Sequence, residues 1–268
     1  MKLLVIGHSV LDFIGSGEEK NSSAGGIYYS VSVLNRLKQD KDEIFLASQF
    51  DDETYFYFKP EFDKVKNRLL KKVDKIPRVH LNLFEYKERH ESYENITGNL
   101  TVEIVNNDNY DAILINMITG FDITLEQLKN IRKKSTALIY IDIHTLSRGL
   151  GANFKREFRI IPEFIKWAEC VDIIQVNDAE LFTLSDKISE YEIACEMFNA
   201  GVKNLCVTKG ELGAKVYFKK SDEIVSYFVS AKKVSDPNII GCGDAFGAAY
   251  FYSYINNKNE TLGCYARH

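Results

Sequence analysis

The sequence predicts a mixed α/β fold in which helices cover both faces of a mostly parallel β-sheet. The main observation is that short apolar runs of strand length alternate along the chain with segments whose apolar residues recur at helical spacing. A second observation is a more polar stretch at residues 79–105, which predicts exposed antiparallel strands with one face in water. A chain of 268 residues can bury one large core or two small ones.

Each buried strand is predicted from a short apolar run, which is typical of a strand covered on both faces. The runs cover residues 3–6, 44–47, 113–116, 137–142, 171–177, 205–208 and 214–218. After the first run, residues 8–24 hold the glycines and serines of a loop or hairpin. Together with residues 79–105, this segment is a natural candidate for a small lid.

Helices are predicted where apolar residues recur at the spacing of an α-helix. One such segment opens at Gly25-Gly26 and continues to Leu37, and the others lie around residues 62–69, 125–131, 158–168 and 191–200. Gly201 follows the last segment, where a helix commonly ends. The alternating order of strands and helices is the one expected for a parallel sheet with helical crossovers.

The composition excludes several classes of function. A net charge of −4 argues against a nucleic-acid binder, which usually carries a basic excess. No apolar run reaches the roughly 18 residues of a membrane helix, and the first residues lack the features of a signal peptide, so we expect a cytoplasmic protein. The five cysteines contain no C-x-x-C pair, which argues against a disulfide framework or a zinc site.

The most informative motif is Gly241-Cys242-Gly243-Asp244, which runs into a helical segment. A glycine-rich turn at a helix N-terminus binds anions, because free N–H groups and the helix dipole both favour negative charge. A carboxylate in such a turn suits a site where a proton must be taken up beside a phosphate. The alternatives are that Asp244 only caps the helix, or that Cys242 is a nucleophile, for which no histidine offers a recognisable partner.

Polar residues also follow several of the predicted strands. Asp142, Asn177 and Thr208-Lys209-Gly210 all come directly at or after apolar runs. Ligands of parallel α/β sheets collect at the carboxyl ends of the strands. We therefore expect a binding site at that edge of the sheet.

Four motifs occur in the order found in one known family. They are Gly25-Gly26, Asn177-Asp178-Ala179-Glu180, Thr208-Lys209-Gly210-Glu211-Leu212-Gly213 and Gly241-Cys242-Gly243-Asp244. Over nearly its whole length the chain resembles the ribokinase-like (PfkB-type) carbohydrate and nucleoside kinases. The resemblance implies a single domain spanning residues 1–268, with a Rossmann-like three-layer α/β/α core and a small β-sheet lid. It also implies transfer of the γ-phosphoryl of ATP, with Mg²⁺, to a hydroxyl of a sugar or nucleoside-like acceptor.

Site roles follow from the resemblance, position by position. Asp244 would be the general base, and the N–H groups of Gly241, Cys242 and Gly243 would form the anion hole. Asn177 and Glu180 would organise Mg²⁺ and its waters, with Glu180 acting through water. The remaining roles are nucleotide binding by Thr208, Gly210 and Gly213, and acceptor binding by Asp12, Gly25 and Gly26. A homodimer through the lid is implied by analogy, and activation by a monovalent cation is left open.

Each of these residues also has a structural interpretation. Asn177 and Glu180 match a helix cap and a first-turn acid. Gly210 and Gly213 match a hairpin turn, and Asp12 alone matches a turn residue.

The chain departs from the family pattern at three places. Ile240 replaces the threonine that usually precedes the glycine loop, and the usual acid before it is displaced to Asp236 or replaced by Asn238. The asparagine that many sugar kinases carry after Gly25-Gly26 is absent, so ribose or fructose is not the default acceptor. The sequence ends some tens of residues earlier than the family's chains, which predicts an adenine site that is incomplete or completed by another subunit.

Two other functions are alternatives to the kinase. One is a non-catalytic family member that binds a nucleotide or sugar as a regulator or sensor; the early end of the sequence and Ile240 favour it, and Asp244 argues against it. The other is an NAD(P) dehydrogenase, for which the turn after the first strand lacks G-x-G-x-x-G.

Overall fold

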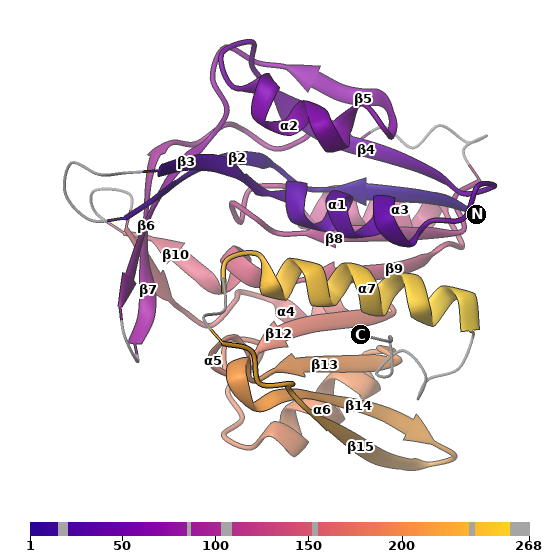
Figure 1. The fold of residues 1–268 in the computed structure, drawn as a ribbon. Helices are drawn as coiled ribbons and strands as arrows, with labels where there is room; N and C mark the ends of the chain where they lie inside the picture. The colour runs from indigo at the N-terminus through magenta and orange to yellow at the C-terminus, as the bar shows by residue number, and fades with distance from the viewer. Residues whose placement is uncertain (16–20, 85–86, 103–108, 152–154, 236–238, 258–268) are drawn as a thin grey trace.

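The computed structural model describes residues 1–15, 21–84, 87–102, 109–151, 155–235 and 239–257, and its largest element is a twisted β-sheet (Figure 1). Its strands, in order across the sheet, are β15 (Glu223–Ser230), β14 (Gly213–Lys220), β13 (Asn204–Thr208), β12 (Ile173–Asn177), β9 (Leu138–Asp142), β8 (Ala112–Asn116), β1 (Lys2–Ile6), β4 (Glu43–Phe50) and β5 (Lys66–Lys72). Neighbours from β13 to β5 are parallel, and only β14 and β15 are antiparallel.

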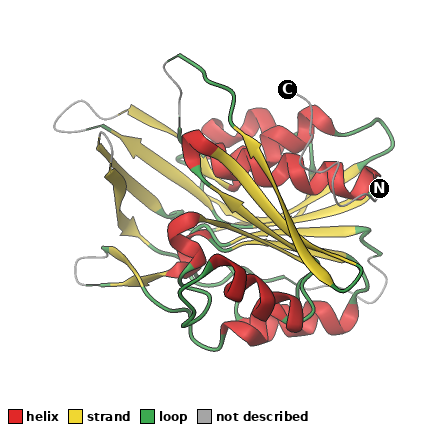
Figure 2. Cartoon of the chain, turned by 90° about the horizontal axis from the view of Figure 1, so that it is seen from below, coloured by secondary structure: helices red, strands yellow, loops and turns green. Residues whose placement is uncertain are grey.

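Helices cover both faces of this sheet (Figure 2). One face carries α1 (Ile27–Leu37), α2 (Tyr55–Phe62) and α7 (Cys242–Asn257), and the other carries α3 (Leu125–Lys134), α4 (Phe164–Ala168) and α6 (Glu190–Asn199). In β1, Leu3 and Val5 pack into one of the two resulting cores, whereas Leu4 and Ile6 pack into the other. Continuous apolar strands are thus explained by burial on both faces, and the predicted three-layer α/β/α fold is confirmed.

A second, four-stranded sheet lies beyond one end of the large sheet (Figure 1). It has the order β3 (Asn21–Gly26), β2 (Ser9–Ile14), β6 (Arg78–Phe84) and β7 (Lys87–Asn95), with only the central pair parallel. We call it the small sheet. It is built from the two segments in which the sequence predicts a hairpin and antiparallel strands. Next to it, β10 (Arg148–Leu150) and β11 (Arg156–Phe158) form a short hairpin.

The topology places a crevice above β1 and β8. From β1 the chain first builds β4 and β5 on one side, and then returns to build β8, β9, β12 and β13 on the other. Where the strand order reverses, the connections leave the carboxyl ends of adjacent strands in opposite directions, and ligands of parallel sheets bind at such switch points. Helix α7 packs against both β8 and β9, so its N-terminus reaches this edge. In the described ranges, no helix is long and apolar enough to cross a membrane.

Two predicted helices are wrong in extent. The helix expected around residues 62–69 ends at Phe62, and the segment that follows is the edge strand β5. Its pairing with β4 outweighs the helical spacing of Val65 and Leu69. The helix expected over 158–168 is only α4, because Pro162 disfavours helical backbone at the residue before it and Phe158 is paired in β11.

The remaining expectations concern β-strands and segments outside the described residues. Strand β15, whose side chains are mostly exposed or half-buried, is not predicted from any pattern in the sequence. Residues 101–102, expected in a strand, have no regular structure. Residues 103–105, the displaced Asp236 and Asn238, and the chain end after residue 257 lie outside the described residues.

Candidate active site

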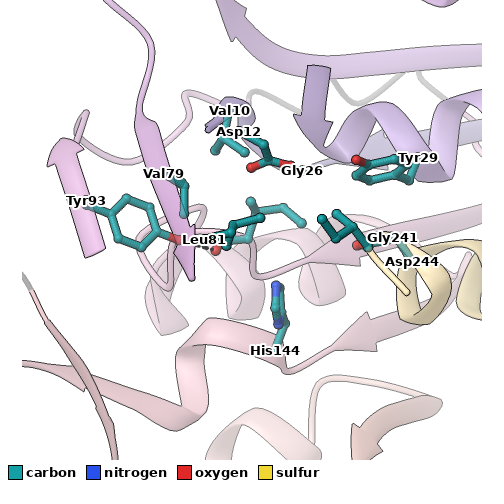
Figure 3. A pocket seen from close by; sticks show the side chains of 12 residues that line it. Val10, Asp12, Gly26, Tyr29, Val79, Leu81, Tyr93, His144, Gly241 and Asp244 are labelled. Carbon is teal, nitrogen blue, oxygen red and sulfur yellow. Dashed lines mark hydrogen bonds between the residues drawn. The ribbon is translucent and has the colours of Figure 1, made fainter. Parts of the chain in front are cut away.

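A pocket opens between the small sheet and the carboxyl ends of the large sheet (Figure 3). The space within its outline is about 360 Å³, a figure that includes space open to solvent. It is lined by Val10, Asp12, Gly26, Tyr29, Val79, Leu81, Tyr93, Ile118, His144, Ile240, Gly241 and Asp244. Asp12 and Asp244, which are far apart in the sequence, therefore share one cavity.

The small sheet supplies Asp12 from β2, and two glycines of β3 explain its position. Asp12 is 4% exposed, and its carboxylate is directed toward the pocket (Figure 3). A Cβ on Gly25 would lie 2.0 Å from Asp12 Oδ2, so Gly25 makes room for this carboxylate. Gly26 has φ +61°, and a Cβ there would lie 2.5 Å from the carbonyl oxygen of His8. Gly26 lines the pocket, whereas Gly25 is not among the lining residues and packs against Asp12.

Helix α7 supplies Asp244 from its first turn. Its Oδ1 accepts a hydrogen bond of 2.9 Å from the side-chain amide of Asn116, the last residue of β8. The Ser30 hydroxyl of α1 contacts the Asp244 backbone carbonyl at 3.4 Å. The carboxylate is only partly buried and faces the pocket, so an acceptor hydroxyl there has access to it.

The loop before α7 is held tightly against α1. Gly241 has φ +76°, and a Cβ there would lie 2.4 Å from the Tyr29 ring, so only glycine is tolerated. The Cys242 N–H donates to the Ile239 carbonyl over a long 3.4 Å, a contact that an anion bound at Cys242 would replace. Burial, followed by the negative charge of Asp244, raises the pKa of the Cys242 thiol. This argues against a thiolate nucleophile.

A buried glutamine of β12 connects the loop to the large sheet. The Gln175 amide nitrogen donates to the Gly243 carbonyl at 3.0 Å and to Asp142 Oδ2 at 3.1 Å, and its oxygen accepts from the Tyr140 hydroxyl. Burial raises the pKa of Asp142 well above its ordinary value; the Asp244 carboxylate adds to the rise, and His144 opposes it. Asp142 is thus a buried acid close to the candidate base.

Asn177 and Glu180 form a reciprocal cap at the start of the short helix α5 (Asp178–Leu181). The Asn177 side chain accepts from the Glu180 N–H at 2.7 Å, and Glu180 Oε2 accepts from the Asn177 N–H at 2.9 Å. Glu180 Oε1 also pairs with Arg148 at 2.9 Å. Although burial raises the pKa of Glu180, its bonds to His144 and Arg148 lower it overall. Asn177 and Glu180 therefore do form the helix cap that their spacing also predicts. A direct bond from Mg²⁺ to Glu180 Oε1 would displace Arg148.

The carboxylates at this edge suit a cation that keeps much of its water shell better than a cation held by protein ligands alone. Within the described ranges, no three His, Cys, Asp or Glu side chains converge as a metal site. Asp142 nevertheless experiences repulsion from both Asp244 and Glu180, which a cation would offset. Mg²⁺ usually keeps several waters and takes one or two carboxylates besides phosphate oxygens. The residues present therefore fit Mg²⁺ bound with phosphate, partly through water.

Thr208, Gly210 and Gly213 lie at the turn between β13 and β14. Gly213 has φ +127°, and a Cβ there would lie 2.0 Å from the Val229 carbonyl; Gly210 has φ +54° in open space. Gly210 and Gly213 thus lie in a hairpin turn, as the structural interpretation predicts. None of the three residues lines the pocket. Register places Thr208 beside Asn177, at the same edge as the predicted phosphate side.

Besides most of the apolar and aromatic lining residues, the sequence reasoning did not identify four polar neighbours of the site: Asn116, His144, Arg148 and Gln175. Asn116 ends a predicted strand, a signal that the strand-end argument applied to Asp142 and Asn177 would have found. Gln175 lies inside an apolar run, where a lone amide is itself a signal of a buried polar role. His144 and Arg148 follow β9 without a recognisable pattern.

Comparisons with known proteins identify the fold. No family model and no curated protein matches this sequence. Among solved structures, a pyrophosphate-dependent kinase in the ribokinase family, complexed with a pyrophosphate analog and myo-inositol, has a TM-score of 0.77 at 15% identity, over 98% of this chain and 90% of that one. Arabidopsis thaliana ribokinase complexed with ribose and ATP has a TM-score of 0.73 at 15% identity, over 99% and 89%. The fold is ribokinase-like.

A third ribokinase-like structure shows the same extent of similarity. Aminoimidazole riboside kinase from Salmonella enterica, complexed with aminoimidazole riboside and an ATP analog, has a TM-score of 0.71 at 18% identity, over 99% of this chain and 89% of that one. The predicted resemblance is confirmed at the level of the fold. Identities this low establish the ribokinase-like fold alone, so the chemistry rests on the site residues.

Proposed function

We propose that this chain is a phosphotransferase that moves the γ-phosphoryl group of ATP to a hydroxyl of a small sugar or nucleoside-like acceptor. The observation that carries the proposal is the position of Asp244. Its carboxylate stands in the first turn of α7, at the switch point of the sheet, in one pocket with Asp12. A helix N-terminus attracts phosphate, and a carboxylate beside it can take the proton of the attacking hydroxyl.

The reaction needs little beyond positioning and charge stabilisation. The acceptor lies between Asp12 and Asp244, with the small sheet acting as a lid over it. Asp244 takes the hydroxyl proton while the hydroxyl oxygen bonds to the γ-phosphorus. The bond from that phosphorus to the β,γ-bridging oxygen breaks, and ADP leaves with the electron pair.

The glycine loop and the acidic edge serve the phosphate side. The N–H groups of Gly241, Cys242 and Gly243 stabilise negative charge on the transferring group. Mg²⁺, held near Asn177 and Glu180 through water, supplies charge neutralisation when bound. Thr208, Gly210 and Gly213 border the nucleotide. Of the three structural neighbours named above, two are described with ATP or an ATP analog and one as pyrophosphate-dependent, so both donors belong in the test.

A second candidate is a non-catalytic sensor of a nucleotide or sugar. The apolar side chain of Ile240 lines the pocket directly before the glycine loop, where it offers no polar contact to phosphate. Pure binding gives no reason for a carboxylate at Asp244, and this favours the enzyme. A homodimer through the lid and a cytoplasmic location stay predictions.

The test measures acceptor-dependent ADP release from Mg²⁺-ATP, and phosphate release from Mg²⁺-pyrophosphate, against a panel of sugars and nucleosides. Asp244→Asn is compared with Asp40→Asn, which changes an exposed aspartate away from the pocket. Loss of the general base predicts a fall of about 10²- to 10⁴-fold in Asp244→Asn only. Folded wild-type protein that transfers phosphate to no acceptor from either donor would establish the sensor instead.

A further inference from the structure

A buried histidine and a buried aspartate meet where the chain returns from the small sheet to the large one. His8 follows β1, Asp122 lies in the loop between β8 and α3, and both side chains are buried. His8 Nδ1 lies 2.9 Å from Asp122 Oδ1, and His8 Nε2 lies 3.2 Å from the carbonyl oxygen of Gly98, which follows β7. We call these contacts of His8 with Asp122 and Gly98 the anchor, because they join the core to the returning end of the small sheet.

The hydrogen-bond partners of the ring decide which of its nitrogens carry protons. Asp122 Oδ1 also accepts from the His8 N–H at 2.8 Å, and Oδ2 accepts from the N–H groups of Thr119 and Gly120 at 2.9 and 3.1 Å. This carboxylate is an acceptor throughout, so Nδ1 donates to it. The Gly98 carbonyl, a backbone group, can only accept, so a hydrogen bond at Nε2 requires a second proton. With both nitrogens as donors, the ring is an imidazolium.

The charges around the ring favour this second proton. Burial raises the pKa of Asp122, but the charge of His8 and the hydrogen bonds from His8 and Thr119 outweigh it and lower the pKa overall. Asp122 therefore carries a negative charge beside the ring. Arg156 of β11 reaches the same loop, where its guanidinium donates to the Thr119 carbonyl. In their hydrogen bonds to residues 7–9, β4 and α1 use neutral groups, namely the Ala47 and Gln49 carbonyls, the Ser48 hydroxyl and the Ile27 N–H.

The anchor lies next to the wall of the pocket. The Tyr93 hydroxyl of β7 donates to the Ile118 carbonyl at 3.0 Å, and both residues line the pocket (Figure 3). Ile118 belongs to the same loop as Asp122, whose backbone carbonyl accepts from the Leu100 N–H at 2.9 Å. The loop that His8 holds therefore carries one wall residue and receives the chain that returns from the small sheet.

We propose that His8 is a positioning residue whose imidazolium fastens the returning end of the small sheet to the core, and that loss of its Nε2 proton as pH rises releases that end. The neutral ring keeps the proton on Nδ1, because Asp122 still accepts there. Its Nε2 then presents a lone pair to the Gly98 carbonyl, and the hydrogen bond becomes a repulsive contact. The consequence for acceptor binding rests on the proposed kinase function, whereas the anchor itself does not.

The first test observes the ring and the returning chain in the wild-type protein, without any ligand. Nitrogen NMR of the histidine rings, with His8 assigned by its absence in His8→Asn, shows which nitrogens carry protons as pH is raised. Hydrogen exchange of the Leu100 amide, corrected for its intrinsic dependence on pH, is measured in parallel. We expect two ring protons at neutral pH, and exchange about tenfold or more faster once Nε2 is deprotonated, because a hydrogen bond from a charged donor is lost. A singly protonated ring at neutral pH, or exchange that ignores the titration, overturns the inference.

His8→Asn separates the two contacts of the anchor. The asparagine amide nitrogen can take the place of Nδ1 and donate to Asp122, but the side chain is too short to reach the Gly98 carbonyl. We expect Leu100 to exchange about tenfold or more faster than in the wild type at neutral pH. His80→Asn makes the same substitution on β6, where the ring is partly exposed, and should leave the exchange of Leu100 unchanged. Wild-type exchange of Leu100 in His8→Asn would overturn the inference.

Asp122→Asn is the second variant, should His8→Asn fail to fold. It keeps an oxygen that can accept from Nδ1 but removes the negative charge that favours the second proton. We expect the Nε2 proton and the protection of Leu100 to be lost together, at a lower pH than in the wild type. Protection that persists after the ring has lost this proton would contradict the anchor.

Steady-state kinetics against the panel of sugars and nucleosides separates this inference from the proposed function. KM for the acceptor should rise about tenfold in His8→Asn, with a smaller change in kcat, because the small sheet holds the acceptor less well. Release of Leu100 that follows the His8 titration, in protein that transfers phosphate to no acceptor, would retain the anchor and reject the kinase. Phosphate transfer by protein in which Leu100 is insensitive to His8 would retain the kinase and reject the anchor.

Discussion

The side-chain amide of Asn116 donates a 2.9 Å hydrogen bond to the carboxylate of Asp244, joining the end of β8 to the first turn of α7. The same nitrogen also donates to the Ser30 hydroxyl at 3.1 Å, so α1, β8 and α7 meet at this amide. Asn116 is 2% exposed. A neutral buried donor fixes the orientation of the carboxylate without neutralising it, which is compatible with the proposed role of Asp244 as general base.

Asn116→Asp is expected to impair the reaction mainly at low pH. A second carboxylate beside Asp244 disfavours the ionised form of the pair, so the acid limb of the pH–rate profile should move to higher pH. The kcat at neutral pH should fall about tenfold or more, because the orienting hydrogen bond is also lost. The measurement is kcat against pH for both proteins. Asn99→Asp, at an exposed position, is the control, and an unmoved acid limb in Asn116→Asp would contradict the assigned role of Asn116.

Gly25→Ala is expected to displace Asp12 and weaken acceptor binding. The new Cβ would lie 2.0 Å from Oδ2 and 2.3 Å from Cγ of Asp12, closer than two atoms can approach, so the carboxylate must leave its position. KM for the acceptor should rise about tenfold or more, with a smaller change in kcat. Gly98→Ala is the matched control because nothing lies within 4 Å of its Cβ. An unchanged KM in Gly25→Ala would show that Asp12 does not hold the acceptor.

Much of the fold could be predicted because its signals are local. A strand buried on both faces must be apolar throughout, so runs such as residues 113–116 are visible in the sequence. Residues 62–69 and 158–168 were misassigned where tertiary pairing or a proline outweighed periodicity. Strand β15 was not predicted, because most of its side chains are exposed or half-buried and the strand is defined by its pairing with β14.

The site was predictable only in part for a similar reason. Asp244 was identified through a motif and Asp12 through the family resemblance, and both line the pocket. Asn116 and Gln175 act across 128 and 68 residues of sequence, and nothing local shows which partner they will meet. The role of Asn177 could not be predicted for a different reason. A helix cap and a site for magnesium-bound water use the same side-chain oxygen, so the residue type does not distinguish them.

Gln175→Leu is expected to destabilise the protein and slow the reaction together. The leucine leaves Asp142 and the Tyr140 hydroxyl without their buried partner and releases the Gly243 carbonyl. A buried polar group that loses its partner costs about 1–3 kcal/mol, so the free energy of unfolding in urea should fall by at least this amount. Gln39→Leu, at an exposed position, controls for the loss of an amide. Should kcat stay at the wild-type value despite the destabilisation, Gln175 would support the fold but not the loop.

Glu190→Gln is expected to lower stability in a pH-dependent way. Burial raises the pKa of Glu190, but hydrogen bonds from Lys209, Tyr217 and Lys215 outweigh it and lower the pKa from 4.5 to about 2. A depressed pKa means that the folded state favours the carboxylate, so its contribution is complete above pH 4.5 and disappears as pH falls toward about 2. Because the group is 26% exposed, solvent screening reduces the effect to about 1 kcal/mol. Urea unfolding at pH 7 and at decreasing pH should show wild type and variant converging as Glu190 is protonated, and a difference that persists at low pH would mean that Glu190 acts by packing rather than by charge.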